Sequence, residues 1–411
     1  MKTNRMMMLG ALALGLLGTG CEPECVDQYD CQNTHGKPSE GKRYTCRAQR
    51  CEQVDLAVPE TDAGTDAGTD AGTDAGTDAG VACADRPHDA KLGTLKLQTG
   101  FTVGESASLP TEIVAVTTVQ QGSAYQVYGV NGADRSLYAL GTWPTLATST
   151  TPLAPIVPES DRTGTIFLSP FLTHEGNRLL AGYTKLGSSF SDVPGKVLVQ
   201  DLGTPASSTS LSAPGNFTAT AVPGAFLIDG LGLEGVADSG AAIYALKTGS
   251  SPFVASRLAT FPESTAASGY SAVTSAHIAV LGSSVYPLNT LRAVTPAVYS
   301  PHLTAGTSFA LTDANAKVAW SGEDLKDVSG FGAGVALHRG PFTSTHDITR
   351  LPLALRGSDD KAVDVGALEP VLTTSDTCTG VLMMAPLGAD LLLGVTDKSG
   401  VRLVRIQKTA P

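Results

Sequence analysis

Short apolar runs separated by turn residues dominate residues 81–411. Runs such as Ala124–Val130 and Ser136–Thr142 are rich in β-branched, aromatic and other apolar residues, and Gly, Asp, Asn, Ser or Pro interrupt them. No long stretch combines a clean 3.6-residue period with capping residues, so helices are expected to be scarce. The pattern therefore predicts an all-β domain.

Pairs of neighbouring runs are predicted to form β-hairpins. Asn131-Gly132 between the first pair is a strong hairpin signal, and Lys398-Ser399-Gly400 forms a tight turn within the last pair. The predicted pairs are Ala124–Val130 with Ser136–Thr142, Leu179–Thr184 with Lys196–Leu202, Ala225–Asp229 with Ala241–Thr248, Val318–Ser321 with Gly334–Arg339, and Leu391–Asp397 with Val401–Ile406.

The spacing of these hairpins predicts an irregular β-propeller of six or seven blades. The chain lacks the WD and kelch signatures, and two stacked β-sandwiches are the alternative architecture. In the propeller, Leu92–Gln98 is predicted to supply a strand to the last blade, next to residues 401–406. Such closure would remove exposed sheet edges.

Composition narrows the class of protein. An apolar content of 42% is too high for a wholly disordered chain. A charged content of 16%, with 45 Gly and 24 Pro among 411 residues, argues against a coiled coil or helical bundle. The net charge of −11 argues against a nucleic-acid partner, because nucleic-acid binding needs a basic surface.

The first twenty residues have the form of a signal peptide. Lys2 and Arg5 precede the apolar run Met6–Leu17, which is shorter than the roughly 20 residues needed to span a bilayer. The following Gly18-Thr19-Gly20-Cys21 resembles the lipobox of bacterial lipoproteins, with Gly18 where an aliphatic residue is usual. This resemblance implies that Cys21 is lipidated and becomes the first residue after cleavage. The alternative is an ordinary secretory peptide followed by a structural Cys21.

The cysteine count and the residue after Cys21 extend the lipoprotein interpretation. The chain has seven cysteines, and lipidation of Cys21 would leave an even number for disulfides. Glu22 follows Cys21, whereas an Asp there retains lipoproteins in the inner membrane under the best-known sorting rule. The resemblance thus implies a lipid anchor in the outer membrane, with the protein facing the periplasm or the cell surface.

Residues 21–60 are predicted to form a small Cys-rich module. Cys25 and Cys31, and then Cys46 and Cys51, lie in a stretch with too few apolar residues for a core, so disulfides would replace one. Their spacing resembles modules that follow lipoprotein signals in myxobacteria-like Gram-negative bacteria. All three pairings of the four cysteines stay open. A four-cysteine zinc site is the alternative, but the usual C-x2-C spacing is missing and no metal is predicted.

Residues 61–80 are five copies of Thr-Asp-Ala-Gly. Such a stretch cannot form a core, and repulsion among its five aspartates extends it, so a disordered linker is predicted. Calcium binding is the alternative, although the repeat differs from the nonapeptide of calcium-binding solenoids.

The remaining cysteines, Cys83 and Cys378, are predicted to form a disulfide. In a closed propeller the first and last segments meet, which would bring the two within bonding distance. The alternative is a buried free Cys378, with Cys83 paired to a cysteine of the small module.

Linear motifs for catalysis or cofactor binding are not found. Residues 230–235 match G-x-G-x-x-G, but another strand is expected after them, and a dinucleotide site needs a helix there. The glycines at 330, 332 and 334 are interpreted as a flexible loop. No G-x-S-x-G or H-E-x-x-H occurs, and the seven histidines are scattered. The sequence therefore predicts no catalytic residue, metal ligand or cofactor.

Two classes of function are consistent with the sequence. The first is a non-enzymatic envelope lipoprotein whose β domain binds a protein or a glycan, which resembles in outline the propeller lipoproteins that assist outer-membrane assembly. The second is an exported hydrolase or lyase that acts on a glycan or similar polymer with two carboxylates from distant strands. The central pocket distinguishes them, because converging His and carboxylate groups favour an enzyme and a Ser/Thr/Gly lining favours binding.

Overall fold

The computed structural model describes residues 42–47, 50–55, 83, 86 and 88–409. Within the last range it leaves out residues 148, 163–165, 169–170, 186–194, 204–206, 214–216, 238–239, 262–269, 286–287, 341–346, 358 and 375. The chain divides into two units, residues 1–77 and 78–411.

In the first unit, strands β1 (Lys42–Arg47) and β2 (Arg50–Asp55) form an antiparallel pair. Cys46 lies opposite Cys51 in the register of this hairpin, and Cys51 is disulfide-bonded. Cys21, Cys25 and Cys31 lie outside the described residues, as do the predicted signal peptide and the Thr-Asp-Ala-Gly repeats.

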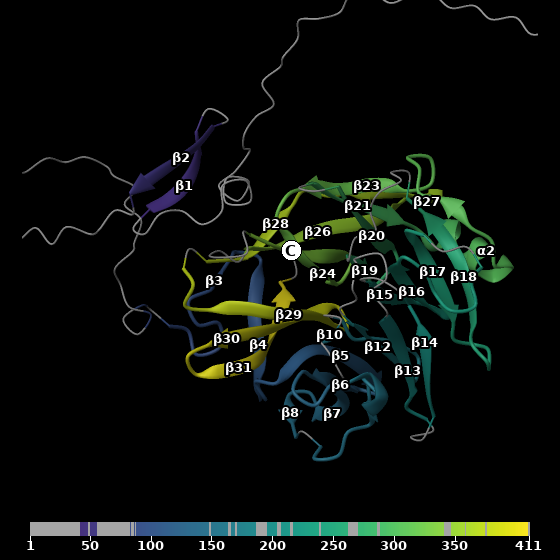
Figure 1. Ribbon diagram of the computed structural model, residues 1–411, viewed down its shortest axis with the longest axis horizontal. Coiled ribbons are helices and arrows are strands. Elements are labelled where there is room, and N and C mark those ends of the chain that lie inside the picture. Colours follow the sequence, from purple (N-terminus) through teal and green to yellow (C-terminus); the bar gives the residue numbers. More distant parts are fainter. Residues whose placement is uncertain are drawn as a thin grey trace, which may run out of the picture. The chain divides into compact units, whose positions relative to one another are not determined.

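The second unit is a β-propeller of six blades arranged in a ring (Figure 1). This result confirms the predicted fold class and fixes the blade number at the lower of the two expected values. Each blade is built mainly from consecutive antiparallel strands, and the sheets are separate from one another, so the alternative of two β-sandwiches is wrong.

The strands of the first three blades follow the sequence closely. Blade 1 contains β5 (Ile113–Gln121), β6 (Ala124–Asn131), β7 (Ser136–Thr142), β8 (Thr145–Leu146) and β9 (Ala154–Pro155). After the 3-10 helix η2 (Glu159–Asp161), blade 2 contains β10 (Ile166–Leu168), β11 (Thr173–Glu175), β12 (Arg178–Lys185), β13 (Gly195–Asp201) and β14 (Ser208–Ser212). Blade 3 contains β15 (Thr218–Val222), β16 (Ala225–Gly230), β17 (Ala242–Lys247), β18 (Val254–Thr260) and the short parallel strand β22 (Phe309–Ala310).

Blades 4 to 6 follow, and the last two include strands from the N-terminal end of the domain. Blade 4 contains β19 (Ser271–Val273), β20 (Ala279–Val285), β21 (Leu288–Val294) and β23 (Lys317–Gly322). Blade 5 contains β24 (Leu325–Gly330), β25 (Gly334–Arg339), β26 (Asp347–Arg356), β27 (Asp359–Val365), β28 (Glu369–Thr373) and β3 (Lys96–Leu97). Blade 6 contains β29 (Gly380–Leu387), β30 (Asp390–Asp397), β31 (Gly400–Lys408) and β4 (Phe101–Leu109).

The N-terminal segment of the domain closes the ring at two blades. Strand β4 pairs with the C-terminal strand β31 in blade 6, and β3 pairs with β28 in blade 5. The prediction that an N-terminal strand closes the last blade is confirmed, but the strand that pairs with residues 401–406 is Phe101–Leu109 and not Leu92–Gln98. The cause is a turn at Thr99-Gly100, where Gly100 has φ +93°, which lets the chain cross from one blade to the next.

Four of the predicted hairpins are confirmed, and one is wrong. The pairs β6–β7, β12–β13, β16–β17 and β30–β31 form as expected. Val318–Ser321 does not pair with Gly334–Arg339, because β23 completes blade 4 on β21 whereas β25 lies between β24 and β26 in blade 5. The boundary between two blades falls inside the predicted hairpin.

Six hydrophobic clusters hold the ring together, and each is shared by two neighbouring blades. Leu227 of blade 3 and Leu281 of blade 4, for example, belong to one cluster and are 1% and 2% exposed. Side chains alternate between the two faces of a strand, so each inner blade strand contributes to two clusters. The core is therefore distributed around the ring between the blades.

The α-helix α2 (Pro296–Ala305) is inserted in blade 4 between β21 and β23. Pro296 begins it, Gly306 ends it with φ +69°, and Tyr299 and Leu303 bury its inner face in the cluster between blades 3 and 4. Within the described part of the chain, no helix has the length and apolar character that crossing a bilayer requires.

Candidate functional site: the central channel

The innermost strands of the six blades surround a central cavity. Each contacts the next around the ring in the order β5, β11, β15, β19, β24, β29, and then β5 again. The cavity that they line has a volume of about 630 Å³. This volume lies within the range typical of small-molecule sites, about 300–1,000 Å³.

Small side chains make up most of the lining. Alanine, valine, threonine, serine and glycine predominate, among them Ala115, Thr117, Ala219, Thr220, Ser271, Val273, Thr274, Ser329 and Gly330. Gly330 is required by packing, because a Cβ there would lie 2.4 Å from the carbonyl oxygen of Val273 on the neighbouring inner strand. Residues 330–334, which the sequence analysis interprets as a flexible loop, form a tight turn between β24 and β25. Gly332 makes this turn possible, because its φ of +58° lies in the left-handed region.

A histidine and a glutamate lie next to each other on β11. His174 is largely buried, and this burial lowers the pKa of its imidazole, with Glu175 opposing the shift. Its Nδ1 lies 3.4 Å from Thr117 Oγ1 of blade 1. Glu175 accepts hydrogen bonds from the Gly224 N–H at 2.9 Å and the Thr248 hydroxyl at 2.6 Å. The carboxylate beside the histidine therefore connects blade 2 to blade 3.

A second carboxyl group lines the cavity from β24. Asp327 lies at a β-bulge, where it accepts hydrogen bonds from the Val328 N–H at 2.8 Å and from the Met384 N–H of blade 6. Burial raises the pKa of Asp327 to about 7, although these two hydrogen bonds act in the opposite direction. Burial also lowers the pKa of the adjacent Lys326, against the effect of Asp324. Burial therefore disfavours the charged form of both side chains.

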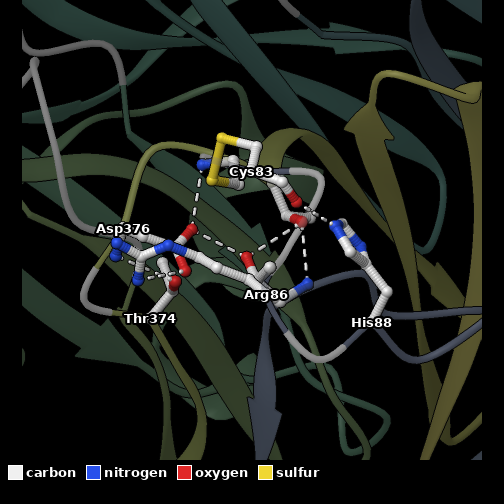
Figure 2. The surroundings of a disulfide bond; sticks show 8 residues. Cys83, Arg86, His88, Thr374 and Asp376 are labelled. Atoms are coloured by element: carbon white, nitrogen blue, oxygen red, sulfur yellow. Dashed lines mark hydrogen bonds and ion pairs between the residues drawn. A yellow bond between two sulfur atoms is a disulfide. The ribbon is translucent and has the colours of Figure 1, made fainter. Parts of the chain in front are cut away.

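The predicted disulfide between Cys83 and Cys378 is present in the structure (Figure 2). The two Cα atoms are 5.3 Å apart, and the bond joins residues separated by 295 positions. Asp376 lies beside it and accepts hydrogen bonds from the Thr94 hydroxyl at 2.7 Å and the Cys378 N–H at 2.9 Å. Arg86 forms an ion pair with the same carboxylate at 3.5 Å. The bond therefore fastens the start of the domain to the segment before blade 6.

The glycine motif at 230–235 does not form a dinucleotide site. Gly230 ends β16, and the described residues between it and β17 contain no helix whose N-terminus would face a pyrophosphate. No group of three or more His, Cys, Asp or Glu side chains with the geometry of a metal site occurs among the described residues.

Sequence reasoning did not single out the groups that line the channel. His174 stands in the sequence only as part of an isolated His-Glu pair, and Asp327 carries no linear motif. Both become site residues because separate blades bring their inner strands around one axis.

Comparisons with known proteins identify no close relative. No protein-family model matches the chain, and no curated protein matches it in sequence. Among solved structures it is similar to the β-propeller domain of Cps50 (Swd1) from Myceliophteria thermophila, with 10% identity over 75% of this chain and 100% of that chain and a TM-score of 0.40. It is also similar to human WBSCR16, with 10% identity, coverage of 74% and 89%, and a TM-score of 0.39. At these values the comparisons assign no function to this chain.

Proposed function

We propose that this protein is a lipid-anchored protein of the bacterial outer membrane whose propeller binds a ligand in its central channel without chemical conversion. The lipid is attached at Cys21, the Cys-rich module and residues 61–80 act as spacer and tether, and the channel is the binding site. A tether of twenty flexible residues gives an average reach of roughly 25 Å.

The lining of the channel is the observation that supports binding over catalysis. Hydrolysis of a glycan needs two carboxyl groups placed on either side of one bond. Glu175, the carboxylate beside His174, is engaged by two donors from blade 3. The remaining wall includes His277, His338, Lys326 and Asp327, but it consists mainly of small apolar and hydroxyl side chains, which orient a ligand by shape and hydrogen bonding.

Two leucines of equal exposure allow a matched test of the channel. Leu382 lines the cavity and is 49% exposed, whereas Leu288 is 46% exposed and lies outside it. Envelope material would be captured on the mature chain, and its components identified by mass. We expect Leu382→Asp to lose the specifically captured ligand and Leu288→Asp to retain it. Equal capture by both variants would place the ligand elsewhere on the protein.

The lipid anchor is tested separately by metabolic acyl labelling. Wild-type protein is expected to carry label and to partition with outer membranes, and Cys21→Ser is expected to lose both properties. Label in both proteins, or in neither, would contradict anchoring at Cys21 and would leave the channel assignment untouched.

A second candidate function is an exported hydrolase or lyase, and Asp327 is the observation that favours it. A carboxyl group with a pKa of about 7 in a cavity is suited to general acid–base catalysis. Labelled envelope polysaccharide incubated with the protein would be shortened by such an enzyme, and Asp327→Asn would abolish the shortening. Intact polymer after incubation with wild-type protein would argue for binding alone.

A further inference from the structure

Three side chains with buried polar atoms lie at the boundary between blades 3 and 4, and we call Thr218, Asp229 and Ser271 the inter-blade niche. Thr218 lies directly opposite Asp229 in the β15–β16 register, so their side chains share one face of blade 3. Leu227 lies two residues before Asp229 on that face and packs in the cluster shared with blade 4. Thr218 and Asp229 therefore face blade 4.

Ser271 lies on the opposite side of the same boundary. Val273, two residues further along β19, packs against the cluster shared by blades 3 and 4, so Ser271 also faces blade 3. Strands β15 and β19 are neighbours in the inner ring, and both Thr218 and Ser271 line the central cavity. Thr218 and Ser271 therefore connect the niche to the channel, and Asp229 lies beside Thr218 on β16, one strand farther from the axis.

The polar atoms of the niche lack hydrogen-bond partners among the described residues. This holds for both carboxyl oxygens of Asp229, for Thr218 Oγ1 and for Ser271 Oγ. Asp229 is only 1% exposed. A buried polar group without a partner costs roughly 1–3 kcal/mol, so such groups call for an explanation in function or ligand binding.

The niche is suited to a neutral ligand with hydroxyl groups. Burial raises the pKa of Asp229 well above its usual value, because desolvation favours the neutral, protonated form of the carboxyl group. A protonated carboxyl and two hydroxyls can each donate and accept a hydrogen bond, as sugar hydroxyls do.

Apolar side chains line other parts of the same cavity. Leu382 and Val381 lie near the start of β29, which is three positions around the ring from β15, and Phe171 precedes β11. Thr218 and Ser271 likewise begin their inner strands. The cavity therefore offers hydrogen-bonding groups at the boundary of blades 3 and 4 and apolar side chains from blades 2 and 6, which match the hydroxyl groups and the C–H face of a sugar ring.

We propose that the inter-blade niche is the specificity site for a neutral carbohydrate, whose hydroxyl groups bond Asp229, Thr218 and Ser271 while its ring packs against Leu382 and Phe171. The inference rests on the proposed binding function of the channel and names the class of its ligand. No bond is made or broken in the ligand.

Calorimetric titration of the mature chain with defined tetrasaccharides tests the proposal. The neutral probes are β1→4-linked glucose, N-acetylglucosamine and mannose, and the charged controls are tetramers of galacturonic acid and of glucosamine. We expect at least one neutral probe to bind and the charged ones to bind at least tenfold more weakly. Asp229→Leu is expected to weaken binding at least tenfold, while Asp229→Asn, which still donates and accepts, stays within about threefold.

Thr349 supplies a matched control for the niche. Its hydroxyl is also buried and has no hydrogen-bond partner among the residues that the structure describes, but it lies on β26 outside the cavity. Thr218→Val is expected to weaken binding about fivefold or more, and Thr349→Val to leave it unchanged, with equal melting temperatures. Equal binding by the wild-type protein and Thr218→Val would contradict the proposal that the niche is the specificity site, and it would not affect the proposal that the channel binds a ligand.

The experiments distinguish an error in the proposed ligand class from an error in the proposed binding site. If no neutral probe binds although Leu382→Asp still abolishes capture of an envelope ligand, the carbohydrate assignment is wrong and the channel remains the binding site. If no probe binds and the leucine variants behave alike, both proposals are wrong.

Discussion

Replacement of Cys83 and Cys378 together by serine is expected to lower the free energy of unfolding substantially. The disulfide closes a loop of 295 residues, and it limits the conformational entropy of the unfolded chain. The chain-entropy model gives roughly 5.7 kcal/mol at 25 °C for a loop of this length. This value is an upper bound, because residual structure in the unfolded state reduces it, and a loss of about 2–5 kcal/mol is expected.

The native fold should survive this double substitution. The ring remains closed by the pairing of β4 with β31 and of β3 with β28, which does not involve sulfur. Urea denaturation followed by far-UV circular dichroism and by the fluorescence of Trp143 and Trp320 measures the change. Substitution is preferable to chemical reduction, because Cys51 is also disulfide-bonded and would be reduced at the same time.

Folding and unfolding rates should respond differently to the double substitution. If the bond acts on the unfolded chain, most of the loss should appear as slower refolding, while the native spectrum stays unchanged. A loss below about 1 kcal/mol with an unchanged urea dependence would refute the reasoning. It would mean that the unfolded chain already keeps the two ends of the domain together.

Three other perturbations follow from the same structure. Asp376→Ala should lower the free energy of unfolding, measured by urea denaturation, by about 1–3 kcal/mol, because it removes the acceptor of three groups near the disulfide. The control Asp364→Ala breaks an exposed ion pair and should lower it by less than about 1 kcal/mol. Asp327 has a folded pKa near 7 against 3.8 when unfolded, so wild-type stability should fall as pH rises from about 4 to 7, by on the order of 4 kcal/mol at most. Asp327→Asn should lack this fall, and parallel pH curves for the two proteins would show that Asp327 ionises normally. Deletion of residues 61–80 should leave the melting temperature of the propeller unchanged, and a drop of several degrees would show that the repeat packs on it.

The closure of the ring also has a defined pH dependence. Burial alone would raise the pKa of Asp376, but the hydrogen bonds from Thr94 and Cys378 and the charge of Arg86 outweigh it and lower the pKa. A lowered pKa contributes stability that is present above the pKa of the unfolded aspartate. This contribution is lost as pH falls through the folded value, so acid should loosen the closure.

The local pattern of the chain was sufficient to predict the fold class and most hairpins. Asn131-Gly132 and Lys398-Ser399-Gly400 mark turns whose flanking runs pair as expected, because a hairpin depends on contacts between residues that are close in sequence. The odd cysteine count and the position of Cys83 and Cys378 at the two ends of the domain were also sufficient to predict their disulfide. The small helix α2 escaped prediction, because it has only ten residues and Pro301 lies inside it.

Only the tertiary structure decided where one blade ends and the next begins. The run Val318–Ser321 has the same character as a hairpin partner of Gly334–Arg339, yet it completes blade 4 by pairing with β21. The choice depends on the cluster between blades 4 and 5, which buries residues that are distant in sequence. The number of blades depends on the same packing.

The candidate site depends still more on tertiary structure. Thr218, Asp229 and Ser271 are ordinary strand residues in the sequence, and the register of β15 with β16 and the packing of blade 3 on blade 4 bring them together. Asp327 acquires its raised pKa from burial beside a strand that begins more than fifty residues later. The sequence by itself determined the strands, the turns and the closing disulfide, because each rests on local patterning or on a cysteine count. The channel and its chemistry were decided by the ring, because a ring places side chains from six separate strands around one axis.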